Sequence, residues 1–412
     1  MSASSDQSST RHNINSLLIT SQIFGLFPTS VNFIGIASLL NYTLPLLQFT
    51  LLVASFYWVH DEVANFKANS LSSTLISVAI IEFILAGFTL VHAVTKTKYI
   101  DHVSRNLDQV NQHLTHLEDN RAHLQSERKL CLLQCGKLLT IFFLCYLGDL
   151  FVIYYVLDVH LLFLLSISYW VHLRLLLLSL HLFTFLSLIQ TRYVRLNTKL
   201  AQCLTSKSVS IFHILPQSIH GEAGPKTVFI GKNKTKQSFS APQSTFISHR
   251  QYKELALAHN ILSECCAHLN VTFSPLVCFL LTHHIVLGVL SLYWIGVHAI
   301  LYYQGGDWEH SYVYLGAVAL LNVKICAHIW FLLSQYSTTQ GQSEETVRLL
   351  NKLFIMSAQT KVNQELRHVR DQLRRHNISF SPYGLFELDQ HFFYTFITII
   401  ITYWVILIQF QV

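Results

Sequence analysis

The chain has 412 residues, of which 51% are hydrophobic and 12% charged, with a formal net charge of +6 and a mean hydropathy of +0.40. This composition excludes a set of ordinary soluble domains and places the chain among polytopic membrane proteins. The positive charge is therefore attributed to loops between membrane spans, and a nucleic-acid partner is not expected.

The first part of the chain is predicted to be a cytosolic segment followed by four membrane spans. Residues 1–40 comprise a polar N-terminal segment, in which no signal peptide is expected, and a membrane-edge helix. Transmembrane helices 1 to 4 lie within 41–189, the fourth over roughly 164–189. The polar stretch 95–134 between the second and third spans is rich in helix-forming residues, so we expect a cytosolic helical loop there.

The second part is predicted to hold three further spans. Residues 190–270 form a cytosolic loop, in which 205–248 carries Gly, Pro, Ser and Lys without a period and is expected to be disordered. An amphipathic helix over 249–269 ends this loop. The remaining segments are transmembrane helices 5 and 6 within 271–336, charged cytosolic anchor helices within 337–383, and a seventh transmembrane helix within 384–412.

The distribution of basic residues predicts the orientation. Of the 28 Lys and Arg residues, 25 lie in loops on the N-terminal side of the membrane, and the opposite loops hold only Lys67. By the positive-inside rule the N-terminus is cytosolic, and seven spans then place the C-terminus outside the cell. The predicted fold is an all-α polytopic membrane protein with seven transmembrane helices and cytosolic helical extensions, inverted relative to a G-protein-coupled receptor.

The seventh span is not apolar on every face. Thr395, Thr398, Thr402 and Gln409 recur at spacings of three, four and seven, which places them along one face of a helix. We call these four residues the polar stripe. One interpretation is that the threonines bond back to carbonyls of their own helix and Gln409 to a neighbouring helix. The other is that the stripe lines water, as pore-facing helices do, and the periodicity alone does not choose between them.

Two sequence motifs occur at this end of the chain. The residues Thr402-Tyr403-Trp404-Val405-Ile406-Leu407-Ile408-Gln409-Phe410 fit the pattern TYhhhhhQF, where h is hydrophobic. Upstream, Gly384-Leu385-Phe386-Glu387-Leu388-Asp389 fits the pattern G-h-F-x-h-D. Together the two motifs resemble the insect gustatory receptor family, in which the second motif opens the final span. The resemblance is sharp over this terminal region and covers the rest of the chain only as topology.

The resemblance implies a tastant-gated, non-selective cation channel in the plasma membrane of a gustatory neuron. Its partners would be a small-molecule tastant, membrane lipid and permeating cations, and it would assemble as a homotetramer or with other gustatory receptors. Gln409 and Phe410 match the family's pore constriction, and Thr402 and Ile406 follow along the wall by spacing. The sugar-receptor branch carries Glu after the signature Tyr, whereas this chain has Trp404, which favours a bitter or plant secondary compound.

Ionisable and aromatic residues in the outer halves of the spans are candidate ligand contacts. Charged side chains within spans are costly unless they are paired or hydrated, so they line a cavity or form structural pairs such as Arg174 with Asp149. The aromatic residues either belong to the interfacial belt or suit an apolar ligand with a few polar groups. The candidate ligand-binding residues are Glu82, Asp149, Tyr154, Trp170, Arg174, Tyr293, Trp294, His298, Asn322 and Lys324.

Several other functions find no support in the motifs. The 23 histidines include no Cys or carboxylate set with metal-ligand spacing, so neither a metal nor another cofactor is expected. The chain has no HExxH, phosphate-binding Gly-rich loop or nucleophile elbow, so we do not expect an enzyme. The alternatives to a tastant-gated channel are a seven-span receptor that signals through a cytosolic partner without a pore, a sugar-gated channel of the same family, and a transporter.

Overall fold

The computed structural model describes five main segments of the chain. They are residues 102–114, 159–214, 249–303, 311–357 and 378–409, together with short stretches between 50 and 92 and between 133 and 148. The predicted N-terminal segment, most of transmembrane helices 1 to 3 and the greater part of the loop 205–248 lie outside the described residues. Every regular element that the structure describes is helical.

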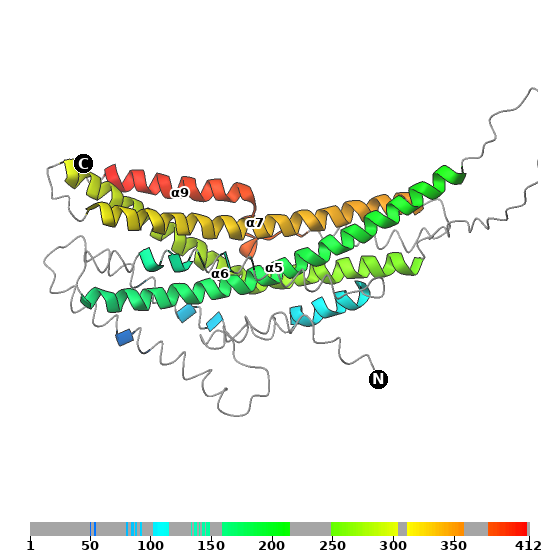
Figure 1. Ribbon diagram of the computed structural model, residues 1–412, viewed down its shortest axis with the longest axis horizontal. Coiled ribbons are helices and arrows are strands. Elements are labelled where there is room, and N and C mark those ends of the chain that lie inside the picture. Colours follow the sequence, from blue (N-terminus) through cyan, green and yellow to red (C-terminus); the bar gives the residue numbers. More distant parts are fainter. Residues whose placement is uncertain are drawn as a thin grey trace, which may run out of the picture.

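Three very long helices form the body of the molecule (Figure 1). They are α5 (Val159–Ile214), α6 (His249–Tyr303) and α7 (Ser311–Ser357). A helix of 56 residues, the length of α5, spans roughly 84 Å at about 1.5 Å per residue, far more than the roughly 30 Å of a bilayer core. Each long helix therefore extends well beyond one face of a membrane that it crosses.

A shorter helix completes the described set of spans. Helix α9 (Gln390–Gln409) has 20 residues, which is roughly 30 Å and matches the thickness of a bilayer core. Within the described part of the chain, four helices are long and apolar enough to cross a membrane, namely α5, α6, α7 and α9. The structure thus shows an all-α protein with long apolar helices, as the composition predicts.

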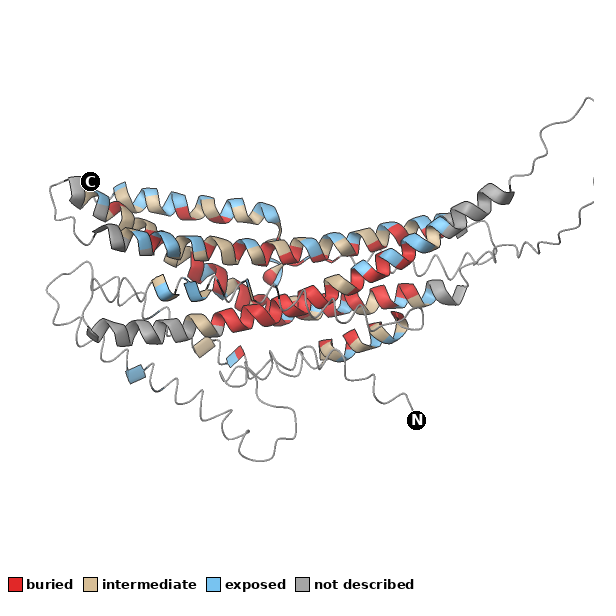
Figure 2. Ribbon diagram, viewed as in Figure 1, coloured by how far each residue is buried: buried red, intermediate tan, exposed pale blue. Residues whose placement is uncertain are grey.

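The centre of the molecule is the middle of α5 (Figure 2). Helix α5 packs mainly against α7, and α6 packs against α5, α7 and α9. The hydrophobic core there includes Leu178, Leu180, Phe183, Leu186, Ile189, Leu276, Leu280, Ile329, Leu332 and Leu333, and polar side chains such as Ser179, His181, Thr184 and Arg192 are buried beside it. Helix α9 is attached to this core along one side only, because it contacts α6 and α7 and leaves its other faces exposed (Figure 2).

The long helices continue through the boundaries expected from the sequence. Helix α5 does not end near residue 189 but runs on to Ile214, so the first residues of the segment 205–248 are helical. The amphipathic helix and fifth span form the single helix α6, and the sixth span and the start of the following charged segment form the single helix α7. Polarity changes along each helix without ending it, and α6 continues even through Pro275.

Polar contacts between helices stabilise the extended part of α5. Asn197 donates from Nδ2 to the carbonyl and the side-chain oxygen of Gln342 at 3.0 and 3.1 Å, and its Oδ1 accepts a hydrogen bond from Thr346. Lys199 donates to the carbonyl of Leu114 at 2.7 Å, the last described residue of the helix over 102–114. These hydrogen bonds give partners to the side chains of Asn197 and Lys199, which the hydrophobic pattern of the sequence does not predict.

The motif before α9 builds a turn and a helix cap. The 3-10 turn η2 (Pro382–Gly384) ends in Gly384 at φ 72°, a left-handed conformation that glycine adopts without strain. The amide of Leu388 donates to the carbonyl of Phe380 at 2.8 Å and closes the loop. Asp389 then accepts the backbone N–H of Phe392 at 2.8 Å, as an N-cap residue does. The last helix therefore begins at Gln390, and 384–389 set its direction.

Candidate functional site

Helix α9 lies in a groove that two glycines create on α6. A Cβ atom added at Gly288 would lie 2.8 Å from Cδ1 of Ile400, and one added at Gly296 would lie 2.5 Å from Cδ1 of Ile408. Ordinary carbon–carbon contacts are about 3.5–4.0 Å. Because the two glycines are eight residues apart and the two isoleucines are also eight apart, each isoleucine occupies the space above one glycine. The groove fixes both the position and the rotation of α9.

The rotation of α9 leaves the polar stripe exposed. Phe396 and Ile400 are buried against the body of the molecule, whereas all four stripe residues are exposed. The hydroxyl of Thr398 donates to the carbonyl of Tyr394, and that of Thr402 donates to the carbonyl of Thr398, both at 2.8 Å. Thr398 and Thr402 are thus bonded back to their own helix, as one interpretation predicts for the threonines, and the stripe also points away from α6 and α7. The two interpretations are compatible.

The predicted pore residues share this exposed face. Thr402, Ile406 and Gln409 are all exposed on α9, and Ile406 retains 41% of its accessible surface. Phe410 lies outside the described residues. Apolar side chains flank the stripe on the same helix, among them Ile401, Tyr403 and Val405. Within this stripe the amide of Gln409 has the greatest need for water or protein beside it, because lipid offers no hydrogen-bond partner and the hydroxyls of Thr398 and Thr402 already donate to their own helix.

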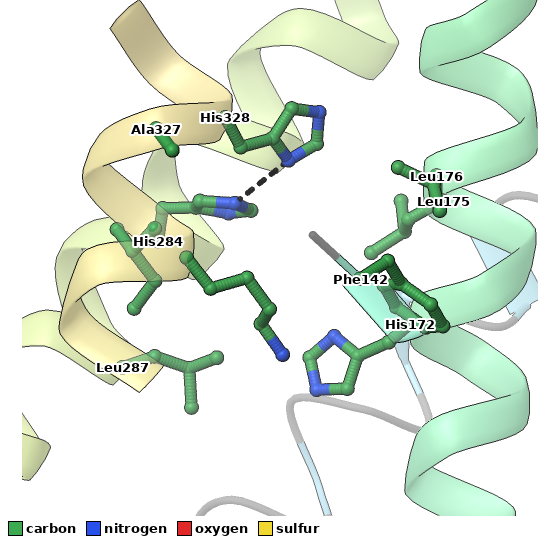
Figure 3. A pocket seen from close by; sticks show the side chains of 10 residues that line it. Phe142, His172, Leu175, Leu176, His284, Leu287, Ala327 and His328 are labelled. Carbon is green, nitrogen blue, oxygen red and sulfur yellow. Dashed lines mark hydrogen bonds between the residues drawn. The ribbon is translucent and has the colours of Figure 1, made fainter. Parts of the chain in front are cut away.

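A second candidate site is a cavity between α5, α6 and α7 (Figure 3). The space is about 540 Å³ when the open solvent at its mouth is counted, and the part that water molecules can occupy is about 40 Å³. Its apolar walls and its basic groups come from helices far apart in sequence. The lining residues are Phe142, His172, Leu175, Leu176, His284, Leu287, Lys324, Ile325, Ala327 and His328.

Histidines join two helices at one side of this cavity. Nε2 of His284 on α6 and Nδ1 of His328 on α7 are 3.2 Å apart, and Figure 3 shows the two rings pointing toward each other. In a neutral pair one nitrogen must donate and the other accept. Whichever histidine donates, the pair then presents one remaining N–H and one bare nitrogen.

These remaining nitrogens are buried polar groups. Among the described residues, Nδ1 of His284, Nε2 of His328 and both ring nitrogens of His283 are buried without a hydrogen-bond partner. The rings of His283 and His172 are 5.2 Å apart, so the imidazoles form a continuous cluster from α5 through α6 to α7. A buried polar group without a partner costs roughly 1–3 kcal/mol. A ligand or water that offers both a donor and an acceptor would remove that cost.

Lys324 is the charged group of the cavity. Its Nζ lies 5.8 Å from the centre of the Phe142 ring, within the range of a cation–π contact. No carboxylate is among the described residues that line the cavity. The cavity therefore combines apolar walls, imidazole donors and acceptors, and one ammonium group, which is the composition of a site for a small apolar molecule with a few polar groups.

The structure separates the candidate ligand residues that the sequence groups together. Lys324 lines the cavity, whereas Asn322 accepts a hydrogen bond from Ser291 at 3.0 Å and donates to the carbonyl of Val318. Tyr293 and Trp294 are half-buried on α6 and stack edge-to-face with each other. For the other six candidates the side chains are outside the described part of the structure: Glu82, Asp149, Tyr154, Trp170, Arg174 and His298.

The histidines of the cavity are the functional candidates that the sequence analysis passed over. The 23 histidines lack metal-ligand spacing, and His172, His283, His284 and His328 were not among the candidates predicted from the sequence. The available signal was their position in long apolar helices, where a polar ring needs a partner. What the sequence cannot show is that α5, α6 and α7 bring the three positions together.

The chain was compared with known proteins. A family model described as "7tm Chemosensory receptor" matches residues 14–412, while no curated protein matches the chain. Two solved structures of the insect olfactory receptor OR5 from Machilis hrabei, one in complex with eugenol, match with a TM-score of 0.59 and 12% sequence identity. Each match covers 98% of this chain and 99% of that chain. At this identity the structural likeness shows a shared fold.

Proposed function

Because this chain belongs to the 7tm chemosensory receptor family, we propose that it is a gustatory receptor that acts as a tastant-gated, non-selective cation channel. It is a multi-pass membrane protein and a receptor rather than an enzyme. The gustatory assignment rests on the terminal motifs TYhhhhhQF and G-h-F-x-h-D, whose Gly384 and Asp389 have the structural roles described above.

The observation that carries the channel proposal is the exposed polar stripe of α9. A membrane-spanning helix that turns a glutamine away from its own bundle needs water or other subunits beside that side chain, and Thr398 and Thr402, whose hydroxyls donate to their own helix, extend the same face. Four copies arranged around a common axis would place the stripe on a water-filled pore and the flanking apolar residues against neighbouring subunits or lipid. Thr402, Ile406, Gln409 and Phe410 would then line the wall, with Gln409 and Phe410 at the constriction.

The ligand would enter the cavity between α5, α6 and α7. Its apolar walls and its basic groups favour a small, largely apolar compound with hydrogen-bonding groups, such as a bitter or plant secondary compound. The structure of OR5 in complex with eugenol provides an example of such a compound bound by a protein of the same fold. The ligand would bind the open state more tightly than the closed state, and this difference in affinity would shift the equilibrium toward opening.

Trp404 supports the choice against a sugar ligand. It takes the position at which the sugar-receptor branch carries Glu, and it is half-buried on α9 with its indole nitrogen 3.5 Å from where a Cβ on Gly296 would lie. The residue that departs from the sugar branch is therefore part of the contact between α6 and α9. A carboxylate there would be placed beside the glycine groove, a site with apolar neighbours.

The proposal is tested by whole-cell current in a heterologous cell with G-protein signalling blocked. Wild-type protein, Gln409→Ala and a control, Ile401→Ala, are exposed to bitter compounds and sugars. Ile401 is also exposed on α9 but lies off the polar stripe. We expect a ligand-evoked cation current that survives the block, with ion permeability ratios that change in Gln409→Ala and not in Ile401→Ala. A response abolished by the block would instead establish a receptor that signals through a cytosolic partner.

A further inference from the structure

Away from the cavity and the pore helix, three potential metal ligands meet between two segments distant in sequence. His102 belongs to the helix over 102–114, and Glu264 and His268 belong to α6. One ligand atom from each residue lies within 4.8 Å of the other two. From this geometry we propose that His102, Glu264 and His268 bind a divalent transition-metal ion, with Zn²⁺ as the ion that fits this donor set.

The two proposed ligands on α6 lie on the same face of that helix. Glu264 and His268 are four residues apart, so they project from the same face of one helix, and Oε1 of Glu264 lies 3.9 Å from Nε2 of His268. The ring of His268 also meets the ring of His102 edge-on, with centroids 4.9 Å apart. The carboxylate and the second imidazole are thus both directed to the side of α6 that carries His102.

The donor atoms of the three side chains are of the kinds that Zn²⁺ binds. Two imidazoles and one carboxylate leave a fourth position for water, which is a known coordination pattern for Zn²⁺. Tetrahedral bonds of about 2.1 Å place ligand atoms roughly 3.4 Å apart, whereas the three ligand atoms lie within 4.8 Å of one another, so the groups must approach by up to about 1.4 Å. Glu264 and His268 have side-chain exposures of 61% and 34%, which leaves them room to rotate and leaves an ion a path from solvent.

The side chain of Asn106 lies next to the ring of His102 and can fix its orientation. Its Nε2 lies 3.4 Å from the side-chain nitrogen of Asn106, a residue that is itself 92% buried. A metal-bound imidazole normally uses its other ring nitrogen in a hydrogen bond that fixes its orientation. With the Asn106 amide turned so that its oxygen faces the ring, His102 would donate from Nε2 and bind the metal through Nδ1.

The location suggests what the metal would do. Figure 1 shows the helix over 102–114 beside the half of α6 that extends away from α9. The charge distribution assigns this half to the cytosol. An ion bound there would join the connection between the second and third spans to the extension of the fifth, and would thereby stabilise their packing.

The experiment measures Zn²⁺ bound to the purified full-length chain by equilibrium dialysis and elemental analysis. The variants are His102→Gln, Glu264→Gln and His268→Gln. The control is His113→Gln, which changes a histidine of the same helix that is outside the cluster. We expect one saturable Zn²⁺ site in wild type and in the control, weakened at least about tenfold in each of the three variants.

A second readout does not depend on counting ions among the 23 histidines. Zn²⁺ should raise the unfolding temperature of the wild type, and this rise should be lost in Glu264→Gln. That exchange preserves the shape of a side chain that is largely exposed, so the variant retains the fold. Equal Zn²⁺ affinity in wild type and Glu264→Gln, or an equal loss in His113→Gln, would overturn the proposal.

Discussion

The closest approach between α6 and α9 gives a sharp prediction for Gly296→Ala. The added Cβ would lie 2.5 Å from Cδ1 and 3.1 Å from Cγ1 of Ile408. These separations are well below an ordinary contact of about 3.5–4.0 Å. Since two atoms of Ile408 are involved, rotation of its terminal methyl group alone does not remove the overlap. Either the whole side chain changes rotamer or α9 moves away from α6.

The expected magnitude follows from two opposing contributions to the free energy of unfolding. Overpacking a close contact lowers it by about 1–3 kcal/mol, whereas replacing glycine by alanine within a helix raises it by about 0.5–1 kcal/mol. The matched control is Gly341→Ala on α7, where an added Cβ meets no atom within 4 Å, so only the favourable contribution remains. Gly296→Ala should therefore be less stable than Gly341→Ala by about 1–3 kcal/mol.

The assay is thermal and denaturant unfolding of the purified chain in detergent, with Ile408→Ala as the second member of a double-mutant cycle. In the background of Ile408→Ala the overlapping atoms are absent, so Gly296→Ala should lose most of its penalty and the two changes should not be additive. If Gly296→Ala were as stable as Gly341→Ala, or if the two effects simply added, the glycine groove would not be what positions α9.

Three further predictions concern the cavity and the start of α9. His328→Leu leaves Nε2 of His284 without its partner and should lower the free energy of unfolding by about 1–3 kcal/mol. Adding His284→Leu should restore part of that loss. If the effects of the two single substitutions simply added in the double variant, the hydrogen bond between the two histidines would be contradicted. Asp389→Ala removes the side-chain acceptor at the start of α9 and should cost about 0.5–2 kcal/mol, seen as faster hydrogen exchange in the first turn of that helix, while Asp389→Asn should show little change. Lys324→Met should raise the half-maximal ligand concentration for current about tenfold or more, equivalent to about 1.4 kcal/mol, and the exposed control Lys352→Met should not; equal potency in both would place the ligand elsewhere.

The last span shows how far the sequence can lead. The spacing of Thr395, Thr398, Thr402 and Gln409 predicts a common face because helical periodicity is a local property, and the structure confirms that they share an exposed face. The segment that ends at Asp389 could be identified as a motif, but its division into turn and cap could not. That division depends on a left-handed glycine and on the Leu388–Phe380 hydrogen bond, and neither has a periodic signature.

Contacts between helices account for what the sequence did not predict. Beyond the end expected for the fourth span, α5 is joined to α7 by the hydrogen bonds of Asn197, and these partners on α7 lie far away in the chain. The histidine cavity and the glycine groove have the same origin: His284 and Gly288 have no distinctive neighbours in sequence, and only the packing of α6 on α7 and α9 gives them their roles. Periodicity predicts which residues share a face of one helix, but it does not identify the helix that packs against that face.

Among the residues of the polar stripe, Gln409 has the greatest need for hydrogen-bond partners outside α9. The hydroxyls of Thr398 and Thr402 already donate to carbonyls of their own helix, so these residues could face an apolar environment at small cost. An amide side chain offers two donors and an oxygen acceptor, and a residue in the last turn of α9 can satisfy few of them within that helix. Gln409→Leu therefore distinguishes the environments of the stripe better than Thr402→Val. If the face contacted lipid, Gln409→Leu would stabilise the protein and leave the current unchanged. If the face lines a pore, the same exchange should preserve folding and reduce conductance, because a hydrophobic constriction gates by losing its water.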